Sequence, residues 1–494
     1  MTLAWCDSPL LGGFGGDNAV YWLTARHWSP WSADSTAAAH VASRSFYPPL
    51  YPAVLAGLGG GISLRAAHWV SGGLLGVGLC TLAWFATLAG CTPRVALAVT
   101  ALAGASRVFL LQALEIHSEH LFLPLSLAAL ALATQVRAQP ASLLPLSACI
   151  AAVTLTRSAG LALLAAYLAW LCLMPLRGRV LAGVLACVPY GVWTLFDDGT
   201  GQYVGGLGGI YGRHGVLDLL IRDVQALWTS WFACFAEPGQ AGFRPALAVV
   251  VAVLAASGTL LRVRARALDG WYVLATLALI VCWPYPAEYE RLLYPLWPVL
   301  CVHAVLAALA LARVRLAGFR YGVGAALVLV LAAEIPFLVL VGERLVNQPD
   351  SPQLAPFVKS SSWFQRDRER AMATVGYEFS VSRGLTELSV RNLVPDDACL
   401  LTTKPSIAAL FADRRAFPLP AFSLPSRDLA QALERQPCPY LFLTASPTPA
   451  YPEPFFPYFR IPTQLEILAE HLNPTFAPGQ RMMPAAMLVR FTQR

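Results

Sequence analysis

Long apolar runs with few charged residues fill the middle of the chain and alternate with short polar connections. A helix that crosses the roughly 30 Å hydrocarbon core of a bilayer needs about 20 apolar residues. Ten runs come near this length, and they cover 66–90, 94–114, 118–135, 141–156, 158–175, 179–197, 245–262, 270–284, 291–312 and 319–341. The pattern predicts a mainly α-helical, polytopic membrane bundle of about ten or more spans. The runs near 141–175 could instead be tilted or re-entrant segments.

Three longer polar segments flank or interrupt this bundle, at 1–65, 198–244 and 342–494. We expect an N-terminal loop over 1–65, a transmembrane bundle over 66–341 that includes the loop 198–244, and a small soluble α/β domain over 342–494. The last segment contains short alternating runs typical of strands, at Ala398–Thr402 and Tyr440–Thr444. Ser406–Phe411 and Ser426–Arg435 are predicted to be short helices, each opened by a serine.

Composition agrees with this picture and excludes other classes of protein. Of the 494 residues, 57% are apolar and 13% are charged, which excludes a disordered chain and disfavours a single water-soluble globule. The formal net charge is +7, but only Lys359 and Lys404 are lysines. The arginines are scattered singly and in pairs between apolar runs, so we expect no nucleic-acid partner.

The positions of the arginines predict the orientation of the spans. When the ten runs alternate in direction, one set of connections collects most of the arginines: Arg94, Arg137, Arg177, Arg179, Arg262, Arg264, Arg266, Arg313, Arg315 and Arg320. The positive-inside rule makes these connections cytoplasmic and places every long polar segment on the periplasmic or outer side of an inner membrane. No apolar helix precedes the outer N-terminal loop, so either a short tail is translocated unaided or, as we favour, an upstream first helix is missing.

Most of the eleven cysteines lie in apolar runs, where a thiol behaves as a small hydrophobic group. Cys399 and Cys438 lie in the polar C-terminal segment, which the arginine pattern places in an oxidising compartment. These two residues are therefore the candidates for a disulfide bridge.

The N-terminal loop holds a candidate catalytic carboxylate. Asp17 and Tyr21 are four residues apart and share a face if the segment is helical. A proline-rich element, Ser45–Pro52, follows and contains Tyr47. A carboxylate just outside the membrane can act as a general base toward an acceptor hydroxyl or amine. The alternative is that Asp17 only caps a surface helix.

Two arginines at outer ends of predicted spans are candidates for binding phosphate. Arg157 and Arg291 each carry a planar guanidinium that can hold a phosphate in a bidentate manner. Arg291 has the acidic neighbours Glu288 and Glu290 in an otherwise apolar stretch, and charge near the membrane often marks function. Each arginine could instead snorkel or pair between helices.

The stretch Glu115–His120 has the composition of a metal site but not the spacing. On one regular helix Glu115 and Glu119 lie in one sector, whereas His117 and His120 point to another. The four side chains therefore cannot meet at one ion. We expect Glu119 to line a donor cavity, where it would contact sugar hydroxyls or an arginine, and it is a second candidate for the catalytic carboxylate. A divalent metal that uses two of these side chains and a distant ligand stays possible. The glycine-rich stretch 199–215 lacks the features of a nucleotide-binding loop, and it is either a mobile lid or a plain flexible loop.

Several of these segments together resemble the bacterial GT-C membrane glycosyltransferases related to aminoarabinose transferases and protein O-mannosyltransferases. The resemblance rests on Asp17 with Tyr21, on the proline-rich Ser45–Pro52, on Ser118–Leu123, on Thr156–Gly160, and on Glu290–Pro298, which is similar to an Arg-Tyr-x-x-Pro stretch. Val394–Leu400 and Phe411–Pro418 resemble the outer C-terminal domain of that family. The chain departs from the family where Asn18 follows Asp17, a position often occupied by Glu, and where Phe46 and Tyr47 precede the prolines in place of a charged residue.

The resemblance implies that the chain transfers a sugar from a polyprenyl-phosphate carrier to a cell-envelope acceptor at the outer face of the membrane. It assigns Asp17 as the catalytic residue. The predicted substrate-binding residues are Tyr21, Tyr47, Glu119, Arg157, Glu290 and Arg291. Two other functions stay open, a transporter or flippase of lipid-linked glycans and a non-catalytic envelope scaffold. A transporter would be expected to show inverted repeats and charges near the bilayer midplane.

Overall fold

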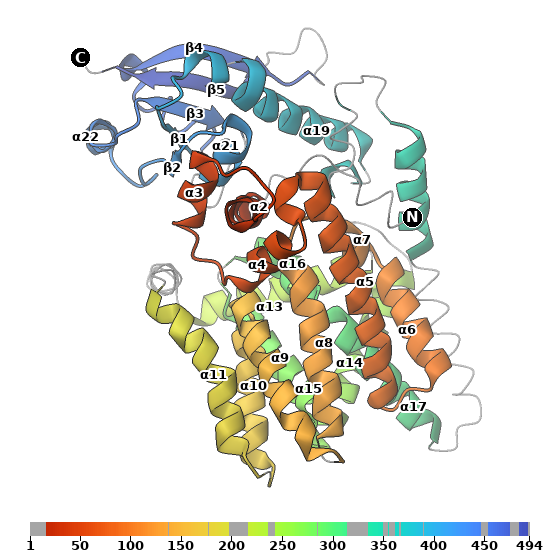
Figure 1. The fold of residues 1–494 in the computed structure, drawn as a ribbon. Coiled ribbons are helices and arrows are strands. Elements are labelled where there is room, and N and C mark those ends of the chain that lie inside the picture. The colour runs from red at the N-terminus through yellow and green to blue at the C-terminus, as the bar shows by residue number, and fades with distance from the viewer. Residues whose placement is uncertain are drawn as a thin grey trace.

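In the computed structural model a long helical bundle carries a small five-stranded sheet at one end (Figure 1). The structure describes residues 16–136, 138–175, 177–196, 216–235, 243–283, 285–313, 334–348, 354, 361–364, 367–388, 390–445, 453–474 and 484–492. The glycine-rich stretch 199–215 and residues 319–333 of the predicted span over 319–341 lie outside these residues.

The N-terminal part of the described chain forms short helices between the bundle and the sheet (Figure 1). These helices are α2 (Gly16–Trp28), α3 (Thr36–Ala42) and α4 (Leu50–Gly57). The Ser35 hydroxyl caps α3 by accepting a hydrogen bond from the Ala38 amide. Gly61 lies so close to α2 that an added Cβ would be 2.7 Å from the Ala25 carbonyl oxygen. The helix that carries Asp17 is thereby held tightly against the turn that leads into the bundle.

The bundle follows the predicted apolar runs. Its elements are α5 (Leu64–Leu88), α6 (Pro93–Ala105), α7 (Arg107–Gln112), α8 (Glu119–Gln135), α9 (Leu143–Thr156), α10 (Gly160–Leu173), α11 (Arg179–Phe196), α13 (Val216–Ala233), α14 (Phe243–Arg264), α15 (Leu268–Val281), α16 (Tyr289–Leu293) and α17 (Trp297–Arg313). The expectation of one continuous span over 94–114 is wrong, because Ser106 is extended and separates α6 from α7.

Length and apolar composition would allow three of the described helices to cross a membrane, namely α5, α11 and residues Arg244–Arg264 of α14. Shorter apolar helices accompany them. The turns that join α5 to α6, α8 to α9 and α10 to α11 lie at the end of the bundle away from the sheet (Figure 1). Arg94 and Arg179 belong to the first turns of α6 and α11. These arginines are therefore far from the N-terminal helices.

The C-terminal part forms a mixed sheet of order β2-β1-β3-β5-β4. The strands are β1 (Leu400–Thr402), β2 (Ala416–Pro418), β3 (Tyr440–Thr444), β4 (Leu465–Leu472) and β5 (Pro484–Phe491). Strand β1 pairs in parallel with β2 and β3, whereas β5 pairs antiparallel with β3 and β4. Helices α19 (Arg368–Arg383), α20 (Val390–Leu393), α21 (Pro405–Ala412) and α22 (Ser426–Glu434) complete this part. The predicted strands and short helices are confirmed, whereas β2, β4 and β5 were not predicted.

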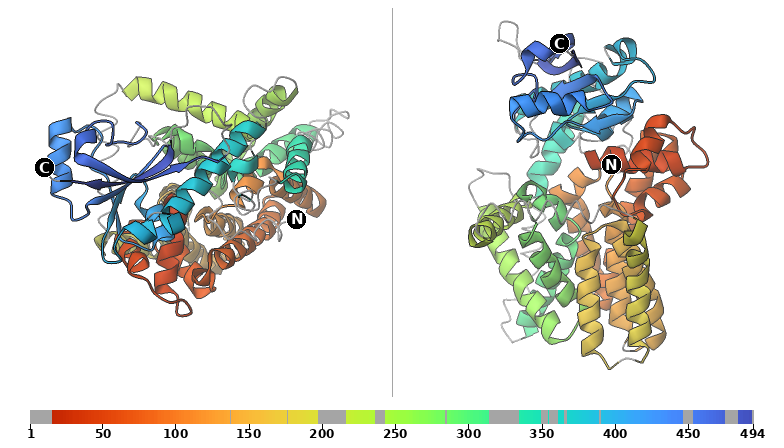
Figure 2. Two further views of the ribbon diagram at one scale, coloured as in Figure 1. Left: turned by 90° about the horizontal axis from the view of Figure 1, so that it is seen from above. Right: turned by 90° about the vertical axis from the view of Figure 1, so that its left-hand side faces the viewer.

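Alternation along the strands gives this sheet two apolar faces. Leu400, Phe442 and Leu488 belong to the same apolar core as buried residues of α2, α3 and α21. Leu401, Leu441 and Val489 point to the other face and pack with residues of α22. One face of the sheet is therefore joined to the N-terminal helices, and Figure 2 shows these helices between the sheet and the bundle.

The predicted bridge between Cys399 and Cys438 is present. It joins the segments that enter the two central strands, β1 and β3, which are neighbours in the sheet. The bridge therefore crosslinks the middle of the C-terminal sheet.

Candidate functional site

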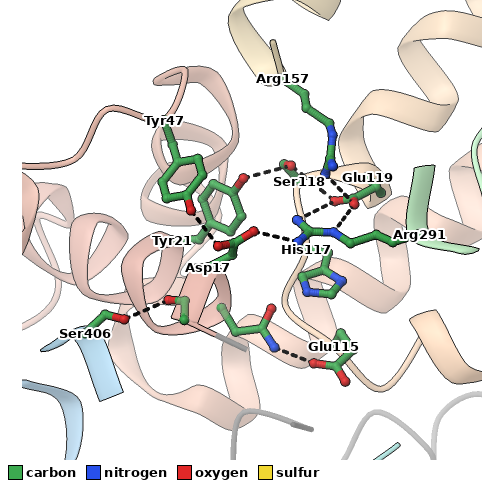
Figure 3. Close-up of polar contacts among 12 residues, drawn as sticks. Asp17, Tyr21, Tyr47, Glu115, His117, Ser118, Glu119, Arg157, Arg291 and Ser406 are labelled. Atoms are coloured by element: carbon green, nitrogen blue, oxygen red, sulfur yellow. Dashed lines mark hydrogen bonds and ion pairs between the residues drawn. The ribbon is translucent and has the colours of Figure 1, made fainter. Parts of the chain in front are cut away.

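The first turn of α2 presents Asp17 toward the end of the bundle nearest the sheet, and both of its carboxylate oxygens have partners (Figure 3). The Tyr47 hydroxyl donates to Oδ1 at 2.5 Å. Nη1 of Arg291 donates to Oδ2 at 2.6 Å. Tyr21 lies one helical turn after Asp17, and its hydroxyl is 3.0 Å from the Ser118 hydroxyl at the start of α8. The N-terminal loop is thus tied to the bundle through side chains that the sequence singled out.

A second carboxylate, Glu119, holds the two predicted phosphate-binding arginines together. Its side chain is fully buried, and Arg157 and Arg291 both form ion pairs with its Oε1. Nη2 of Arg291 also lies 3.4 Å from Oε2. Figure 3 shows the two guanidinium groups approaching Glu119 from different helices. The site therefore joins two cations to two carboxylates, and Arg291 bridges Asp17 and Glu119.

Tight turns place the two arginines at this end of the bundle. Arg157 ends α9 in an extended conformation, and its carbonyl accepts a hydrogen bond from the Gly160 amide. A Cβ on Gly160 would lie 2.7 Å from the Val153 carbonyl oxygen, so only glycine fits this close reversal into α10. Arg291 lies in α16, a five-residue helix that follows a 3₁₀ turn over Pro286–Glu288.

A cavity of about 450 Å³ opens beside this charged cluster. Asp17, Arg157, Arg291 and Glu288 form its polar part. Its apolar walls come from the proline-rich element and from α10, α11, α15 and the segment that follows α15; they include Phe46, Leu161, Tyr190, Trp193, Leu279 and Trp283. Charge is thus concentrated at one part of the cavity, and aromatic and aliphatic side chains from the bundle line the rest.

The electrostatic environment keeps Asp17 ionised. Burial raises the pKa of its carboxyl, but the Arg291 guanidinium and the Tyr47 hydrogen bond more than offset that effect and hold the pKa below its ordinary value. His117 lies close by, and its surroundings favour the neutral form of its side chain. Burial, together with Arg291, holds the pKa of its imidazole well below the usual range. At neutral pH the cluster therefore contains a charged Asp17 and a neutral His117.

The remaining polar residues of the 115–120 stretch have structural partners. Nδ2 of Asn18 donates to Glu115, which places the residue after Asp17 against the bundle. Two oxygens of Gln112 accept hydrogen bonds from this stretch: Oε1 accepts from Nδ1 of His117 at 3.1 Å, and the backbone carbonyl accepts from Nε2 of His120 at 3.0 Å. Within the described ranges no group of three or more His, Cys, Asp or Glu side chains could hold a metal ion.

The structure separates Glu290 from the residues predicted with it. Its carboxylate lies 3.7 Å from Arg107, and it does not line the cavity. Glu288 lines the cavity instead. The sequence alone indicated only that Glu288 is an acidic neighbour of Arg291. The other predicted site residues, Asp17, Tyr21, Tyr47, Glu119, Arg157 and Arg291, lie together as the preceding contacts describe. Residue spacing alone could not distinguish the two glutamates, because the directions of their side chains depend on the 3₁₀ turn before α16.

Comparisons with known proteins find likeness in structure alone. No family model matches the chain, and no curated protein matches its sequence. A crystal structure of ArnT from Cupriavidus metallidurans bound to undecaprenyl phosphate aligns with a TM-score of 0.52 and 13% sequence identity, covering 99% of this chain and 95% of that one. The apo structure of the same protein gives a TM-score of 0.51 at 13% identity, with the same coverage.

The archaeal oligosaccharyltransferase AglB from Archaeoglobus fulgidus aligns less well. Its TM-score is 0.48 at 12% identity, over 89% of this chain and 67% of that one. The alignment with ArnT spans nearly the whole of both chains, and it includes the bundle as well as the C-terminal sheet. The chain therefore has a GT-C-like glycosyltransferase fold.

Proposed function

We propose that this protein is an integral-membrane glycosyltransferase that transfers a sugar from a polyprenyl-phosphate-linked donor to a cell-envelope acceptor. The observation that carries the proposal is the cavity that combines two arginines and two carboxylates, Asp17 and Glu288, with apolar walls from the bundle. A lipid-linked sugar phosphate needs both kinds of surface. The likeness to ArnT, whose structure contains undecaprenyl phosphate, supports the same class of donor.

In this proposal Arg157 and Arg291 bind the donor phosphate. Their side chains are 13% and 15% exposed, so each guanidinium is mostly shielded from water yet reaches the cavity. Electrostatic attraction is stronger in such an environment than in bulk water. As the bond to the sugar breaks, the negative charge that develops on the phosphate is stabilised by these two cations. Glu119 orients both guanidinium groups and balances their charge while no donor is bound.

Asp17 is the catalytic carboxylate of the proposed reaction. It lines the cavity near both arginines, and it can accept a hydrogen bond from an acceptor hydroxyl or amine and so polarise that bond. Tyr47 and Arg291 hold its two oxygens in place. Tyr21 fixes the same helix against Ser118, and it lines the cavity as well.

The orientation predicted from the arginines would place this cavity on the periplasmic face of an inner membrane. Asp17, Arg157 and Arg291 lie at the end of the bundle nearest the sheet, whereas Arg94 and Arg179 open helices at the other end. Charges grouped at one end of the bundle favour an enzyme over a transporter, whose charges would be expected near the bilayer midplane.

The test compares the envelope of a strain that lacks the gene with strains that carry the wild-type protein, Asp17→Asn or Asp34→Asn. Mass spectrometry of envelope lipids and glycans should reveal a sugar that disappears on deletion and returns with the wild type. Asp17→Asn should fail to restore it at equal membrane abundance. Asp34 pairs with His27 on the exposed side of the N-terminal helices, so Asp34→Asn should restore it fully. Unchanged glycans in the deletion strain would contradict the proposal and favour a scaffold.

A further inference from the structure

Glu288 is a second carboxylate in the cavity, and it has no part in the roles proposed for Asp17 and the two arginines. It ends the 3₁₀ turn Pro286–Glu288, immediately before α16, and it lines the same cavity as Asp17. The charged groups that face it are Arg291, Asp17, Arg157 and Glu119, which lie on four different elements. The cavity therefore contains two carboxylates and two guanidinium groups around one space.

The two cavity carboxylates differ in how they are engaged. Asp17 already accepts one strong hydrogen bond on each oxygen, from Tyr47 and from Arg291. The Glu288 carboxylate makes no hydrogen bond or ion pair with the part of the chain that the structure describes. A carboxylate held by two donors is a weak base, because protonation would weaken both of those hydrogen bonds. Glu288 has no such contacts to lose.

We propose that Glu288 is a second catalytic residue, which receives the proton of the acceptor nucleophile while Asp17 orients that nucleophile. The inference rests on the proposed transferase function. In a single displacement, the acceptor oxygen or nitrogen forms a bond to the anomeric carbon, and the bond from that carbon to the phosphate oxygen breaks. Its electron pair stays on the phosphate, which leaves as polyprenyl phosphate between Arg157 and Arg291. The proton moves from the nucleophile to a Glu288 oxygen and then passes to solvent through the cavity mouth.

The surroundings of Glu288 suit it to this step, because they raise the pKa of its carboxyl above the ordinary value. Burial raises the pKa of its carboxyl, Asp17 and Glu119 raise it further, and Arg291 and Arg157 oppose the rise without cancelling it. A base is more effective when its pKa approaches the working pH. Because the unprotonated form is the active one, transfer should fall as the pH drops through this raised pKa. The pKa of Asp17 is lowered, so Asp17 should titrate only at more acidic pH.

The decisive experiment uses the purified full-length protein and membranes from the deletion strain, which contain donor and unmodified acceptor. Product is measured by mass spectrometry from pH 4.5 to pH 8 for the wild type, Glu288→Gln and Glu290→Gln. Loss of a general base costs about 100-fold or more in rate, so Glu288→Gln should be slower by that factor and should lose the acidic limb of the pH profile. Glu290 is the matched control, because it is two residues away, has the same chemistry and lies outside the cavity.

Binding of undecaprenyl phosphate, followed by native mass spectrometry, shows whether each variant is folded. Glu288→Gln should bind this lipid as the wild type does, because the phosphate is assigned to the arginines. If Glu288→Gln transfers the sugar at the wild-type rate, or keeps the acidic limb, the role of Glu288 is refuted and the proposed function stands. If the wild-type protein itself forms no product, both proposals are overturned. If Glu288→Gln fails to bind lipid, Glu288→Asp must regain binding and part of the rate for the inference to survive.

Discussion

Two networks of buried charge lie at opposite ends of the bundle, and they differ in what surrounds them. The network nearest the sheet joins Asp17, Glu119, Arg157 and Arg291 beside an open cavity. The other network centres on Asp269, at the beginning of α15. Its Oδ2 accepts from Arg262 at 2.7 Å and lies 3.1 Å from Nε2 of His303, while Nδ1 of His303 is 2.9 Å from the Thr259 hydroxyl.

Packing distinguishes the two networks. At the Asp269 network, α14 and α17 are in backbone contact, and a Cβ on Gly258 would lie 2.0 Å from the His303 carbonyl oxygen. Asp269 and His303 are also almost completely buried, at 2% and 0% exposure. Asp269, Arg262 and His303 pair with one another, and none of the three lines the apolar cavity of about 560 Å³ that Thr259 borders. Buried and paired charge is therefore insufficient to identify a site, and the open space beside the charge is the more informative observation.

The largest effect on transfer should come from Arg291→Ala. This change leaves Asp17 and Glu119 close together without the cation that bridges them and removes one ligand of the donor phosphate. Removal of a group that stabilises the charge developing in the transition state costs about 100- to 1,000-fold in rate, so transfer per folded molecule should fall at least about 100-fold. Arg291→Lys keeps the charge but loses the bidentate geometry. Its transfer rate should therefore lie between those of the wild type and Arg291→Ala. Wild-type transfer by Arg291→Ala would contradict the assignment.

The matching change in the other network should affect stability rather than transfer. Asp269→Ala leaves Arg262 and His303 without their shared acceptor, and we expect the free energy of unfolding to fall by about 3 kcal/mol or more. Thermal unfolding in detergent measures this loss as a lowered midpoint. Transfer by the fraction that stays folded should remain within about twofold of the wild type, because the two networks share no partner. A specific loss of activity in stable Asp269→Ala protein would show that the networks are coupled.

A smaller effect is expected from Tyr47→Phe, which removes one hydrogen bond from Asp17. A hydrogen bond to a charged group contributes about 1.5–3 kcal/mol, so transfer should fall by about tenfold or somewhat more. The pKa of the Asp17 carboxyl should rise toward its ordinary value, so the second and more acidic step of the pH profile, which belongs to Asp17, should move to a higher pH. Tyr51→Phe is the control. Its hydroxyl contacts Ser71 at 2.8 Å, away from the cavity lining, and its loss should leave the pH profile unchanged.

The smallest effect is expected from Glu290→Gln. Its side chain is about half exposed, and the carboxylate lies 3.7 Å from Arg107, so little interaction energy is lost. Transfer and the unfolding midpoint should both stay close to wild type, with changes of about 0.5 kcal/mol or less. A loss comparable to that of Glu288→Gln would mean that the geometry of α16 during the reaction differs from the geometry described above.

Much of the outer cluster was predictable because it depends on where helices end. Arg157 and Glu119 were each expected at the outer end of an apolar run, and residues at the same end of a bundle lie at the same level. Asp17 and Tyr47 lie only thirty residues apart in one polar segment. The pairing of Arg291 with Glu119 joins positions 172 residues apart, and it required the packing of the helices to be known.

Other features depended on local geometry that the residue pattern does not encode. Ser106 interrupts an apolar stretch without a proline at the break, and the single charge that follows it, Arg107, does not by itself predict the end of a helix. Strand β4 was not predicted, because a bulge between Ile467 and Ala469 breaks the alternation of buried and exposed positions. The side chains of Glu288 and Glu290 point in different directions because a 3₁₀ turn ends where α16 begins.

The hydrogen bond from the Ser406 hydroxyl to the Gly16 carbonyl spans 390 residues of chain and ends one residue from Asp17. Ser406 lies in the first turn of α21, directly after the strand that begins at the disulfide. The sheet and the N-terminal helix are therefore one mechanical unit at this point. A chimera that exchanges the C-terminal sheet for that of another GT-C-like protein would have to reproduce this contact, since a shift of α21 would also displace Asp17 from Arg291.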